Sequence, residues 1–540
     1  MTLNDPTAPW WRHAVCYQVY VRSFADSDGD GIGDLPGITS RLPYLRDLGV
    51  DALWITPFYT SPQNDHGYDV ADYCDIDPLF GSLDDADHLV RRAHDLGLRV
   101  IVDLVPNHTS SEHEWFQAAL AAGPGSPERE RYHFVPVDPE NPDTPPNNWK
   151  SVFGGPAWTK AEAPEGADFP AEWYLHIFDS TQPDLNWRNP AIGDMFEGVL
   201  RFWLDRGVDG FRIDVAHGLF KAAGLPDEVL PEETDGETVH VGEGSMVERG
   251  PGDEPMWDQP EVHDVYRRWR KILEEYDGDR MAVAEAWTKT TESMARYVRP
   301  DELHQAFNFS WLLAEWSAES FAEVVTGTLD AVDPVGASPT WVLSNHDVVR
   351  HPSRYGAERG HARARAATLA MLALPGSAYV YQGEELGLEQ VEVEPEFRQD
   401  PSWFRTGEPG RDGCRVPIPW GGDEPPFEFG PGEGQPWIPQ PAEWKALTVE
   451  AQEADPESTL AFYRRALATR REAALPEGDR VQVAQPSPLG ADVLDLRRGN
   501  LRVLLNCGDT AVDLPEGEVV IASGTLPGGK LPADTAVWLR

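Results

Sequence analysis

Cysteine is scarce in this chain, which has only four in 540 residues, Cys16, Cys74, Cys414 and Cys507. None of them lies in a CxxC pair, the spacing typical of zinc sites and redox motifs. So sparse a set also excludes a scaffold that depends on disulfides. We therefore expect free thiols and a cytoplasmic protein.

Basic residues are also few, since 45 Lys and Arg stand against 91 Asp and Glu, for a formal net charge of −46. A chain this acidic repels nucleic-acid phosphates and anionic lipid, so neither is an expected partner. We interpret the acidity as a solvated surface that keeps the protein soluble. Nothing in the sequence predicts an oligomeric state.

Long hydrophobic runs are missing as well. The longest apolar stretch, residues 366–381, is broken by Pro375 and Gly376, whereas a membrane helix needs about 20 apolar residues in a row. Residues 1–13 contain no basic segment followed by an apolar one, so no signal peptide is expected. No GxGxxG turn opens a helix, which disfavours a doubly wound dinucleotide-binding sheet, and we expect no organic cofactor.

What the chain does contain is an alternation of short apolar runs and amphipathic segments, the pattern of βαβ units. Eight runs are candidate strands: residues 14–20, 52–55, 100–104, 210–213, 281–284, 306–309, 340–343 and 378–381. Helical periodicity lies between several of them, at residues 84–96, 192–206, 260–276 and 363–374. Eight strands in this order predict the α/β class and a closed parallel (β/α)8 TIM barrel.

Two stretches interrupt this rhythm. Residues 106–184 and 384–450 are rich in Pro and Gly and have no regular period, and an insertion as long as the first is usually functional. A helix is expected at 456–474, followed by short apolar runs separated by turns. We predict a barrel of residues 1–106 and 180–475, an irregular inserted domain of residues 107–179 after strand 3, and a C-terminal antiparallel, sandwich-like β domain of residues 476–540.

Ionisable residues follow several of the predicted strands at their carboxyl ends, where barrel enzymes place their active sites. They are Asp103 near the end of the third strand and His108 after it, Arg212 and Asp214 at the end of the fourth, Glu285 after the fifth, and His346 and Asp347 after the seventh. A lone Asp there is more often a helix N-cap, and a lone His or Arg is usually structural. Their coincidence on one rim favours an active site.

Glycoside hydrolysis is the chemistry that uses such a set. One carboxylate attacks the anomeric carbon, and one carboxylic acid protonates the leaving oxygen and then activates water. Arg212 lies two residues before Asp214, so both side chains face the same way and the guanidinium favours an ionised carboxylate. Ala284, Ala286 and Trp287 give Glu285 apolar neighbours, which favour a protonated acid.

Several longer motifs occur together between about residues 10 and 420. They are Asp103-Leu-Val-Pro-Asn-His108, Gln182-Pro-Asp-Leu-Asn186, Gly210-Phe-Arg-Ile-Asp-Val215, Ala284-Glu-Ala-Trp287, Ser344-Asn-His-Asp347, Gly383-Glu-Glu-Leu-Gly387 and Arg411-Asp-Gly-Cys-Arg-Val-Pro-Ile-Pro-Trp420. Because these motifs occur in this order, the chain resembles the α-amylase superfamily of glycoside hydrolases, in its α-glucosidase and oligo-1,6-glucosidase branch. The motifs are weak singly and specific together.

The resemblance implies catalytic roles by position. It implies that Asp214 is the nucleophile, that Glu285 is the general acid/base and that Asp347 stabilises the transition state. Arg212 matches the residue that orients the nucleophile. The implied enzyme is a retaining glycosidase, in which water or a second sugar can intercept the covalent intermediate.

The resemblance also implies a glucose-binding set. His108 and His346 match ligands of the glucose hydroxyls, and Tyr68 matches a stacking tyrosine. Asp65 and Arg415 match a charged pair that grips the far end of the glucose. Such a pair excludes further sugars, which implies exo-acting removal of terminal glucose from maltose, short malto- or isomalto-oligosaccharides, or sucrose.

Two departures leave the preferred linkage open. Relatives read Arg-Thr-Pro-Met-Gln-Trp where this chain reads Arg415-Val-Pro-Ile-Pro-Trp420. Val215 resembles enzymes that accept α-1,6 bonds, yet Ala216-His217 does not follow their usual continuation. We favour a broad α-glucosidase; the alternatives are an oligo-1,6-glucosidase and a transglycosidase such as a sucrose isomerase or trehalose synthase. A non-enzymatic glycan-binding or transporter-associated relative is disfavoured, because all three catalytic carboxylates are present.

An acidic loop follows the first predicted strand. Asp26, Asp28, Asp30 and Asp34 alternate with small residues, and Ile32 continues the spacing. Alternating oxygen ligands with glycines for turning resemble the first part of an EF-hand loop, although the flanking helix and final Glu are missing. A solvated acidic turn is the alternative. We favour a structural Ca²⁺ site, with Mg²⁺ as the second choice, because clustered carboxylates repel one another without a cation.

Overall fold

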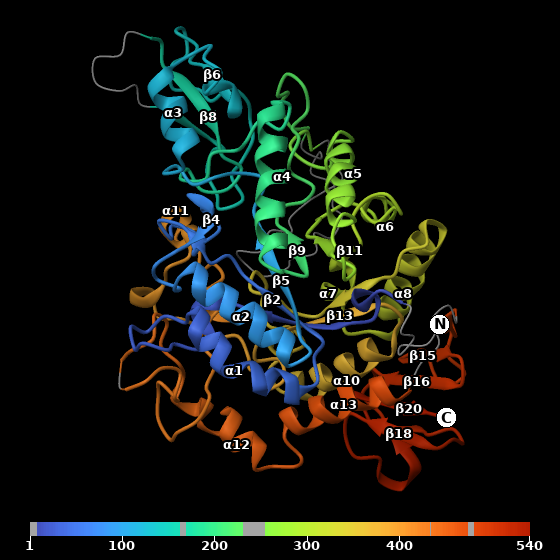
Figure 1. The fold of residues 1–540 in the computed structure, drawn as a ribbon. Coiled ribbons are helices and arrows are strands. Elements are labelled where there is room, and N and C mark those ends of the chain that lie inside the picture. Colours follow the sequence, from blue (N-terminus) through green and yellow to red (C-terminus); the bar gives the residue numbers. More distant parts are fainter. Residues whose placement is uncertain (1–7, 162–168, 230–253, 433, 474–479) are drawn as a thin grey trace.

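The computed structural model describes residues 8–161, 169–229, 254–432, 434–473 and 480–540 (Figure 1). Its centre is a closed barrel of eight parallel strands in the order β1-β13-β12-β11-β10-β9-β5-β2. They are β1 (Val15–Val19), β2 (Ala52–Ile55), β5 (Arg99–Leu104), β9 (Gly210–Ile213), β10 (Met281–Ala284), β11 (Gln305–Asn308), β12 (Thr340–Val342) and β13 (Ser377–Tyr381). Each corresponds to one predicted strand, which confirms the (β/α)8 barrel.

Helices surround the barrel. The long ones are α1 (Leu35–Leu48), α2 (Leu83–Asp95), α4 (Pro190–Asp205), α5 (Val262–Leu273), α8 (Ala318–Val332), α10 (Gly360–Ala373) and α13 (Thr459–Ala473); the short ones are α6 (Thr291–Arg296), α7 (Phe309–Leu312) and α9 (His351–Arg354). Local signals start them. Ser82 and Asp85 form a capping box at α2, and Asn189 caps α4, which begins with Pro190.

Side chains from alternate strand positions fill the barrel interior. Cys16, Trp54, Val283 and Tyr379 belong to one buried cluster, separate from the main core between strands and helices. The Trp54 ring lies 5.0 Å from the guanidinium carbon of Arg212. The lumen is therefore a packed floor beneath the carboxyl ends of the strands, not a pore.

The segment between β5 and β9 has regular structure of its own and projects from one end of the barrel (Figure 1). It contains α3 (Glu114–Ala122) and an antiparallel sheet, ordered β6-β8-β7, of β6 (Phe134–Pro136), β7 (Trp158–Ala161) and β8 (Glu172–Leu175). We expected an irregular segment, and this part of the prediction is corrected. Elements of 3 to 9 residues are too short to reveal a period in the sequence.

The remaining elements lie in connections and in the C-terminal part. The connections hold β3 (Tyr59–Thr60), β4 (Asp72–Ile76), α11 (Pro401–Thr406) and α12 (Val449–Glu453). The C-terminal part has a sheet ordered β14-β15-β16-β20-β18 and a separate β17-β19 pair. Their bounds are β14 (Gln482–Val483), β15 (Val493–Arg498), β16 (Leu501–Asn506), β17 (Val512–Asp513), β18 (Val519–Ala522), β19 (Lys530–Leu531) and β20 (Thr535–Leu539).

The C-terminal sheet is antiparallel, as predicted, and β16 and β20 contact α10 of the barrel. A small cluster with Leu504, Leu531 and Val537 joins the two C-terminal sheets. The predicted boundary between residues 475 and 476 lies outside the described residues. Within the described part of the chain, no helix combines the length and the apolar character that crossing a bilayer requires.

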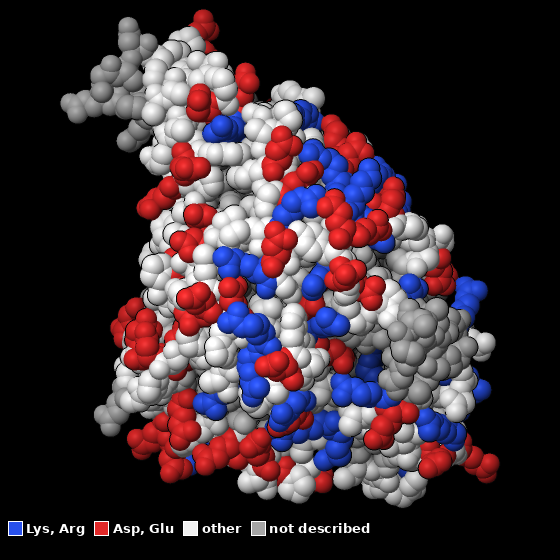
Figure 2. Space-filling model, in the orientation of Figure 1, with Lys and Arg blue, Asp and Glu red and all other residues white. Residues whose placement is uncertain are grey.

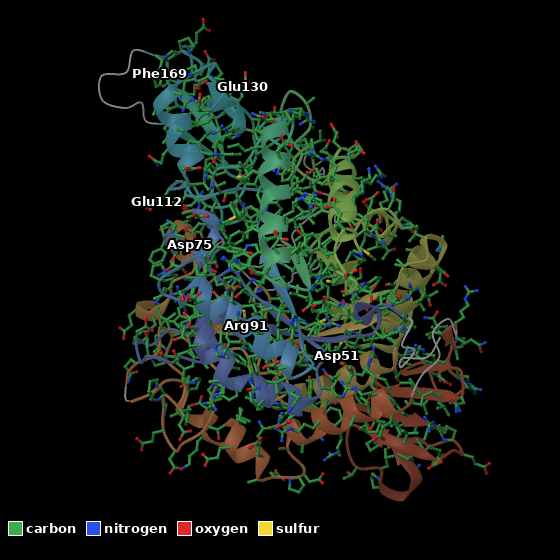
Figure 3. The ribbon with its side chains drawn as sticks, viewed as in Figure 1. Asp51, Asp75, Arg91, Glu112, Glu130 and Phe169 are labelled. Atoms are coloured by element: carbon green, nitrogen blue, oxygen red, sulfur yellow. The ribbon has the colours of Figure 1, made fainter. Side chains whose placement is uncertain are left out.

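Charge is distributed widely over the surface. Figure 2 shows acidic and basic side chains interspersed on one face, with acidic ones gathered along its lower left edge. Figure 3 gives the orientation: Asp51 lies near the amino end of the barrel strands, whereas Asp75 and Glu112 lie where the inserted segment meets the barrel. The carboxyl ends of the barrel strands therefore lie at the end that carries the inserted segment.

Candidate active site

The structure brings the predicted catalytic residues to one end of the barrel. Asp214 directly follows β9 and Glu285 directly follows β10. The two strands pair in register, with Val283 opposite Arg212. Asp347 comes from the loop after β12. All three carboxylates are at most 6% exposed, so they act in a medium that strengthens electrostatic interactions.

One guanidinium joins three of the buried carboxyl groups. Arg212 forms ion pairs with Asp103 at 2.9 Å and with Glu285 Oε2 at 3.0 Å, and it also donates to Asp214 Oδ1. Arg212 itself is 1% exposed. The predicted nucleophile and acid/base are therefore held by the same cation, with Asp103 as a further buried anchor.

The protonation of this cluster follows from burial and charge. Burial raises the pKa of Asp214 well above its usual range; Arg212 opposes this, while Glu285 and Asp103 reinforce it. Burial likewise raises the pKa of Asp103 to about 6, against the attraction of Arg212. Asp214 and Asp103 share the Arg212 cation, so the protonation of each depends on the other. The sequence reasoning weighed only the effect of Arg212 on Asp214, whereas burial acts on this pKa in the opposite direction.

Backbone geometry fixes Glu285 next to Asp214. The Val215 N–H donates to Glu285 Oε2 at 2.8 Å, and the Trp287 indole donates to Oε1 at 2.9 Å. Val215 has a φ of 45°, an unfavourable conformation for a β-branched residue. Local strain of this kind is found where surrounding structure fixes a functional geometry.

Asp347 differs from the other carboxylates in its surroundings. Arg415 and Arg411 reach its Oδ1 at 3.0 and 3.1 Å, and His346 lies 3.3 Å from its Oδ2. Burial would raise the pKa of Asp347, but the attraction of His346 and the two arginines outweighs it and holds this pKa below its ordinary range. The group is a permanent carboxylate, as expected for one that stabilises developing positive charge.

The partner of Asp65 is not the one that we expected. Arg411 contacts Asp65 Oδ1 at 2.7 Å, and Gln182 donates to its Oδ2 at 3.1 Å. Arg415 instead donates to the His346 carbonyl at 2.8 Å and to Asp347. The expected Asp65–Arg415 pair is therefore corrected to Asp65–Arg411. Arg411 opens the same sequence motif as Arg415, so either arginine fitted the pattern before distances were known.

The expected histidine and tyrosine ligands lie beside these carboxylates. Tyr68 donates to Asp103 at 3.0 Å, and its ring stacks on His346 with the ring centres 5.3 Å apart. His108 is 3.1 Å from the Tyr68 carbonyl. Burial lowers the pKa of His108 to about 4 and that of His346 far below its usual range. Both imidazoles are therefore neutral at physiological pH and can exchange hydrogen bonds with hydroxyl groups.

A buried lysine contacts His108 indirectly, through Asn107, and the sequence did not predict it. Lys221 reaches Asp184 at 2.7 Å and donates to Asn107 at 2.9 Å, and Asn107 contacts His108 at 3.2 Å. Asp184 and Asn107 were quoted within motifs. Lys221 has no motif spacing of its own, so only the structure identifies it.

Aromatic side chains from the inserted segment form a wall that was also missed. The Phe153 ring lies 4.7 Å from the Arg411 guanidinium carbon, and Phe178 lies 5.2 Å from the His108 ring. Phe178 also approaches Trp257, at 6.4 Å between ring centres. Single aromatic residues in an irregular stretch carry no sequence signal for this position.

The acidic loop after β1 supplies a compact oxygen cluster. Carboxylate oxygens of Asp26, Asp28 and Asp34 lie within 4.8 Å of one another. Asp30 is not in this group; its Oδ1 accepts the Ile32 N–H at 2.8 Å. Three carboxylates suit a hard cation such as Ca²⁺. The Ile32 carbonyl as a further ligand stays a prediction.

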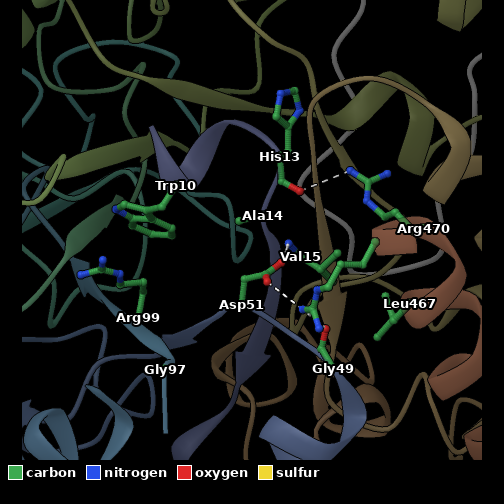
Figure 4. Close-up of a pocket in the computed structure, with 11 residues that line it drawn as sticks. Trp10, His13, Ala14, Val15, Gly49, Asp51, Gly97, Arg99, Leu467 and Arg470 are labelled. Carbon is green, nitrogen blue, oxygen red and sulfur yellow. Dashed lines mark hydrogen bonds and ion pairs between the residues drawn. The ribbon is translucent and has the colours of Figure 1, made fainter. Parts of the chain in front are cut away.

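A cavity of about 220 Å³ lies at the opposite end of the barrel (Figure 4). Its lining includes Val15 and Arg99, the first residues of β1 and β5, and Asp51 just before β2. Arg470 donates there to the carbonyls of Gly376, Leu374 and Leu372, and Arg471 binds Asp51 at 2.9 Å. These guanidiniums bind groups near the amino ends of the barrel strands. Barrel enzymes have their active sites at the carboxyl ends, so this cavity is not the active site.

Comparison with known proteins agrees with this geometry. Residues 18–478 match the model of the alpha amylase catalytic domain. The chain belongs to the alpha-amylase family. It is therefore a glycoside hydrolase, which confirms the resemblance seen in the motifs.

Individual relatives point to the expected branch. A probable alpha-glucosidase of Rhizobium meliloti (strain 1021) is 39% identical over 481 residues, covering 87% of this chain and 84% of that protein. An oligo-1,6-glucosidase of Heyndrickxia coagulans is 33% identical over 494 residues, 84% of each. The crystal structure of the alpha-glucosyl transfer enzyme XgtA superposes with a TM-score of 0.87 at 37% identity, covering 99% of this chain and 100% of that one. The α-glucosidase branch is thus confirmed.

Proposed function

We propose that this protein is a retaining, exo-acting α-glucosidase that removes terminal glucose from maltose and other short α-glucosides. The observation that carries the proposal is the single guanidinium of Arg212 in contact with both Asp214 and Glu285. Carboxylates brought so close leave room for direct attack by one of them, whereas inversion needs a wider gap for water.

In the proposed reaction, Asp214 attacks the anomeric carbon while Glu285 gives its proton to the leaving oxygen. Glu285 then takes a proton from water, which displaces the glucosyl group from Asp214. Asp347, held as a carboxylate by Arg411 and Arg415, stabilises the positive charge that develops on the sugar ring in the transition state of each step. His108, His346 and Tyr68 contact the glucose, and Asp65 with Arg411 grips its far end.

The exo mode rests on the Asp65–Arg411 pair. The two side chains are 4% and 7% exposed, and Arg411 lies over the Phe153 ring, which supports a pocket closed behind one sugar. Transfer to a second sugar is part of the proposal, since a covalent intermediate accepts either nucleophile, and a similar structure belongs to an alpha-glucosyl transfer enzyme. Oligo-1,6-glucosidase and sucrose-isomerase or trehalose-synthase activity are the alternatives for the preferred bond.

A bound Ca²⁺, with Mg²⁺ as the second choice, belongs to the proposal as a structural ion. Asp26, Asp28 and Asp34 would hold it. The loop is joined to the segment after β13, because Asp26 N–H donates to the Phe429 carbonyl and Trp437 N–H donates to the Gly31 carbonyl. We also propose a cytoplasmic location, on the basis of the four free cysteines.

The proposal is tested by incubating the protein with maltose, isomaltose, sucrose and trehalose and identifying products over time. Glucose should appear from maltose at the earliest times, with transfer products at high substrate concentration. Asp214→Asn is the matched control, because an amide cannot form the glycosyl ester. Sucrose converted to an isomer without free glucose would select the isomerase alternative, and inertness toward all four sugars would refute the proposal.

A further inference from the structure

Helix α11, in the segment after β13, is fastened to the inserted segment by one arginine. Arg405 donates to the Gly154 carbonyl from Nε at 3.1 Å and from Nη2 at 2.9 Å. Its Nη1 forms an ion pair with Asp179 Oδ2 at 3.1 Å. The two side chains are 20% and 15% exposed, so the contact is partly protected from solvent. Residues about 250 positions apart in the chain thus meet at one guanidinium.

The turn that Arg405 holds is tightly built. Ser151 N–H donates to the Gly155 carbonyl at 3.0 Å, and Ser151 Oγ donates to the Phe178 carbonyl at 2.7 Å. Gly154 has a φ of 89°, and a Cβ at this position would lie 2.3 Å from Thr406 Cγ2. The turn therefore fits against α11 with no spare room.

The same turn carries Phe153 under the arginine that grips the substrate. The Phe153 ring lies 4.7 Å from the Arg411 guanidinium carbon. Asp400, the N-cap of α11, binds Arg411 Nε at 2.5 Å. Contacts therefore run in a closed ring from Arg405 to the turn, through Phe153 to Arg411, and back through Asp400 to α11.

We infer that Arg405 is a positioning residue that sets the affinity for the terminal glucose by holding the 151–155 turn against Arg411. The inference rests on the proposed function and names a residue that acts on it from outside the sugar pocket. Arg405 pairs with Asp179 and the Gly154 carbonyl, whereas Asp214, Glu285 and Asp347 have other partners. Removing the Arg405 contacts should displace the 151–155 turn and its Phe153 ring and leave the reacting carboxylates in place.

Arginine is suited to this position in a way that lysine is not. The planar guanidinium directs two donors at one carbonyl and a third at a carboxylate, whereas an ammonium is a compact point charge on a flexible stem. Arg405→Lys should therefore retain only part of the effect. Arg398, in the same segment, donates to the Val393 carbonyl and lies over the Trp403 ring, so Arg398→Ala removes a guanidinium without touching the turn.

The experiment measures kcat and KM on maltose and the inhibition constant of glucose for the wild type, Arg405→Ala, Arg405→Lys and Arg398→Ala. Arg405→Ala should raise KM and the inhibition constant about 5- to 20-fold and change kcat by less than about 3-fold. Arg405→Lys should fall between it and the wild type, and Arg398→Ala should match the wild type. Asp179→Asn combined with Arg405→Ala should add little to the single changes, because the two residues share one contact.

A second variant keeps the inference testable if Arg405→Ala fails to fold. Gly154→Ala leaves every charge in place but forces the turn away from Thr406, and it should raise KM in the same way. Unchanged KM and inhibition constant in both Arg405→Ala and Gly154→Ala would overturn the inference. If Arg405→Ala lowered kcat and the melting temperature but left KM unaltered, Arg405 would be a merely structural residue. That result would also overturn the inference. Wild-type inactivity toward α-glucosides would refute the proposed function instead.

Discussion

Arg212 organises the reacting groups because it contacts Asp103, Asp214 and Glu285 at once. Burial and the neighbouring carboxyl groups raise the pKa of Asp214, and Arg212 opposes this shift. Asp347 has the opposite environment, with two arginines and a histidine around a single carboxylate. Neighbouring carboxyl groups thus acquire different protonation states from their surroundings.

Arg411→Ala is the residue-scale test of glucose recognition. The change leaves Asp65, Asp347 and Asp400 buried without this partner, at a cost of roughly 3–5 kcal/mol for a broken buried pair. Because the same grip positions the anomeric carbon, kcat/KM on maltose should fall by at least about 100-fold, through both constants.

Kinetics of Arg411→Ala and Arg415→Ala, measured side by side, separate the two arginines. Arg415→Ala should impair catalysis chiefly through Asp347 and His346, which it contacts directly. Near-normal KM for Arg411→Ala with a large rise for Arg415→Ala would restore the pairing that the sequence first suggested.

At the scale of elements, Arg411 and Arg415 come from the segment after β13 and not from a barrel strand. The loop after β1 and the segment after β13 are bonded to each other, and Ser23, just before the acidic loop, contacts Arg415 through its hydroxyl. The Trp437 indole donates to the same Ser23 oxygen at 3.0 Å. A cation on Asp26, Asp28 and Asp34 would stabilise this joint region without meeting the substrate.

Chelation should therefore lower the melting temperature more than it lowers activity. An ion that binds only the folded state stabilises by mass action, about 2.7 kcal/mol at a hundred times its dissociation constant. Thermal melts with and without EDTA, together with elemental analysis of the purified protein, check this. Asp28→Asn should weaken the response, whereas Asp30→Asn should not, because Asp30 lies outside the oxygen cluster. An identical melt in EDTA and no bound metal would refute the site.

The sequence predicted the elements that carry a period and missed those that do not. Every barrel strand was located, because a buried strand between amphipathic helices has a strong pattern. Helix α3 and strands β6 to β8 were missed because they are short. Likewise, Asp214 and Glu285 could be located because they end predicted strands. Arg411 and Phe153 come from segments without periodicity, so their contacts could be found only in the folded structure.

At the scale of the whole molecule, buried acids make stability depend on pH. Burial raises the pKa of Glu384, which lies just after β13, from 4.5 to about 8, and raises that of its neighbour Glu385. Such a group favours the folded state below its unfolded pKa, and that contribution is lost as pH rises through the folded pKa. The contribution of Glu384 to the free energy of unfolding should therefore decline between about pH 5 and pH 9.

Glu384→Gln isolates this contribution, because an amide has nearly the same shape and never ionises. The melting temperature of the variant should fall less than that of the wild type between pH 6 and pH 9. The corresponding difference in the free energy of unfolding is at most about 1.4 kcal/mol for each unit of pKa shift. Melting curves over this range provide the measurement. Parallel wild-type and variant profiles would mean that Glu384 ionises normally in the folded protein.

The account depends most directly on double displacement by Asp214 and Glu285, and the anomer of the first product tests it. Proton NMR of the hydrolysis of an aryl α-glucoside, whose leaving group is not a sugar, recorded in the first minutes before mutarotation, distinguishes the two anomers of the released glucose. Retention through an ester on Asp214 predicts α-glucose first, with β-glucose appearing only later by mutarotation. Initial appearance of β-glucose would contradict the mechanism and the roles assigned to both carboxylates.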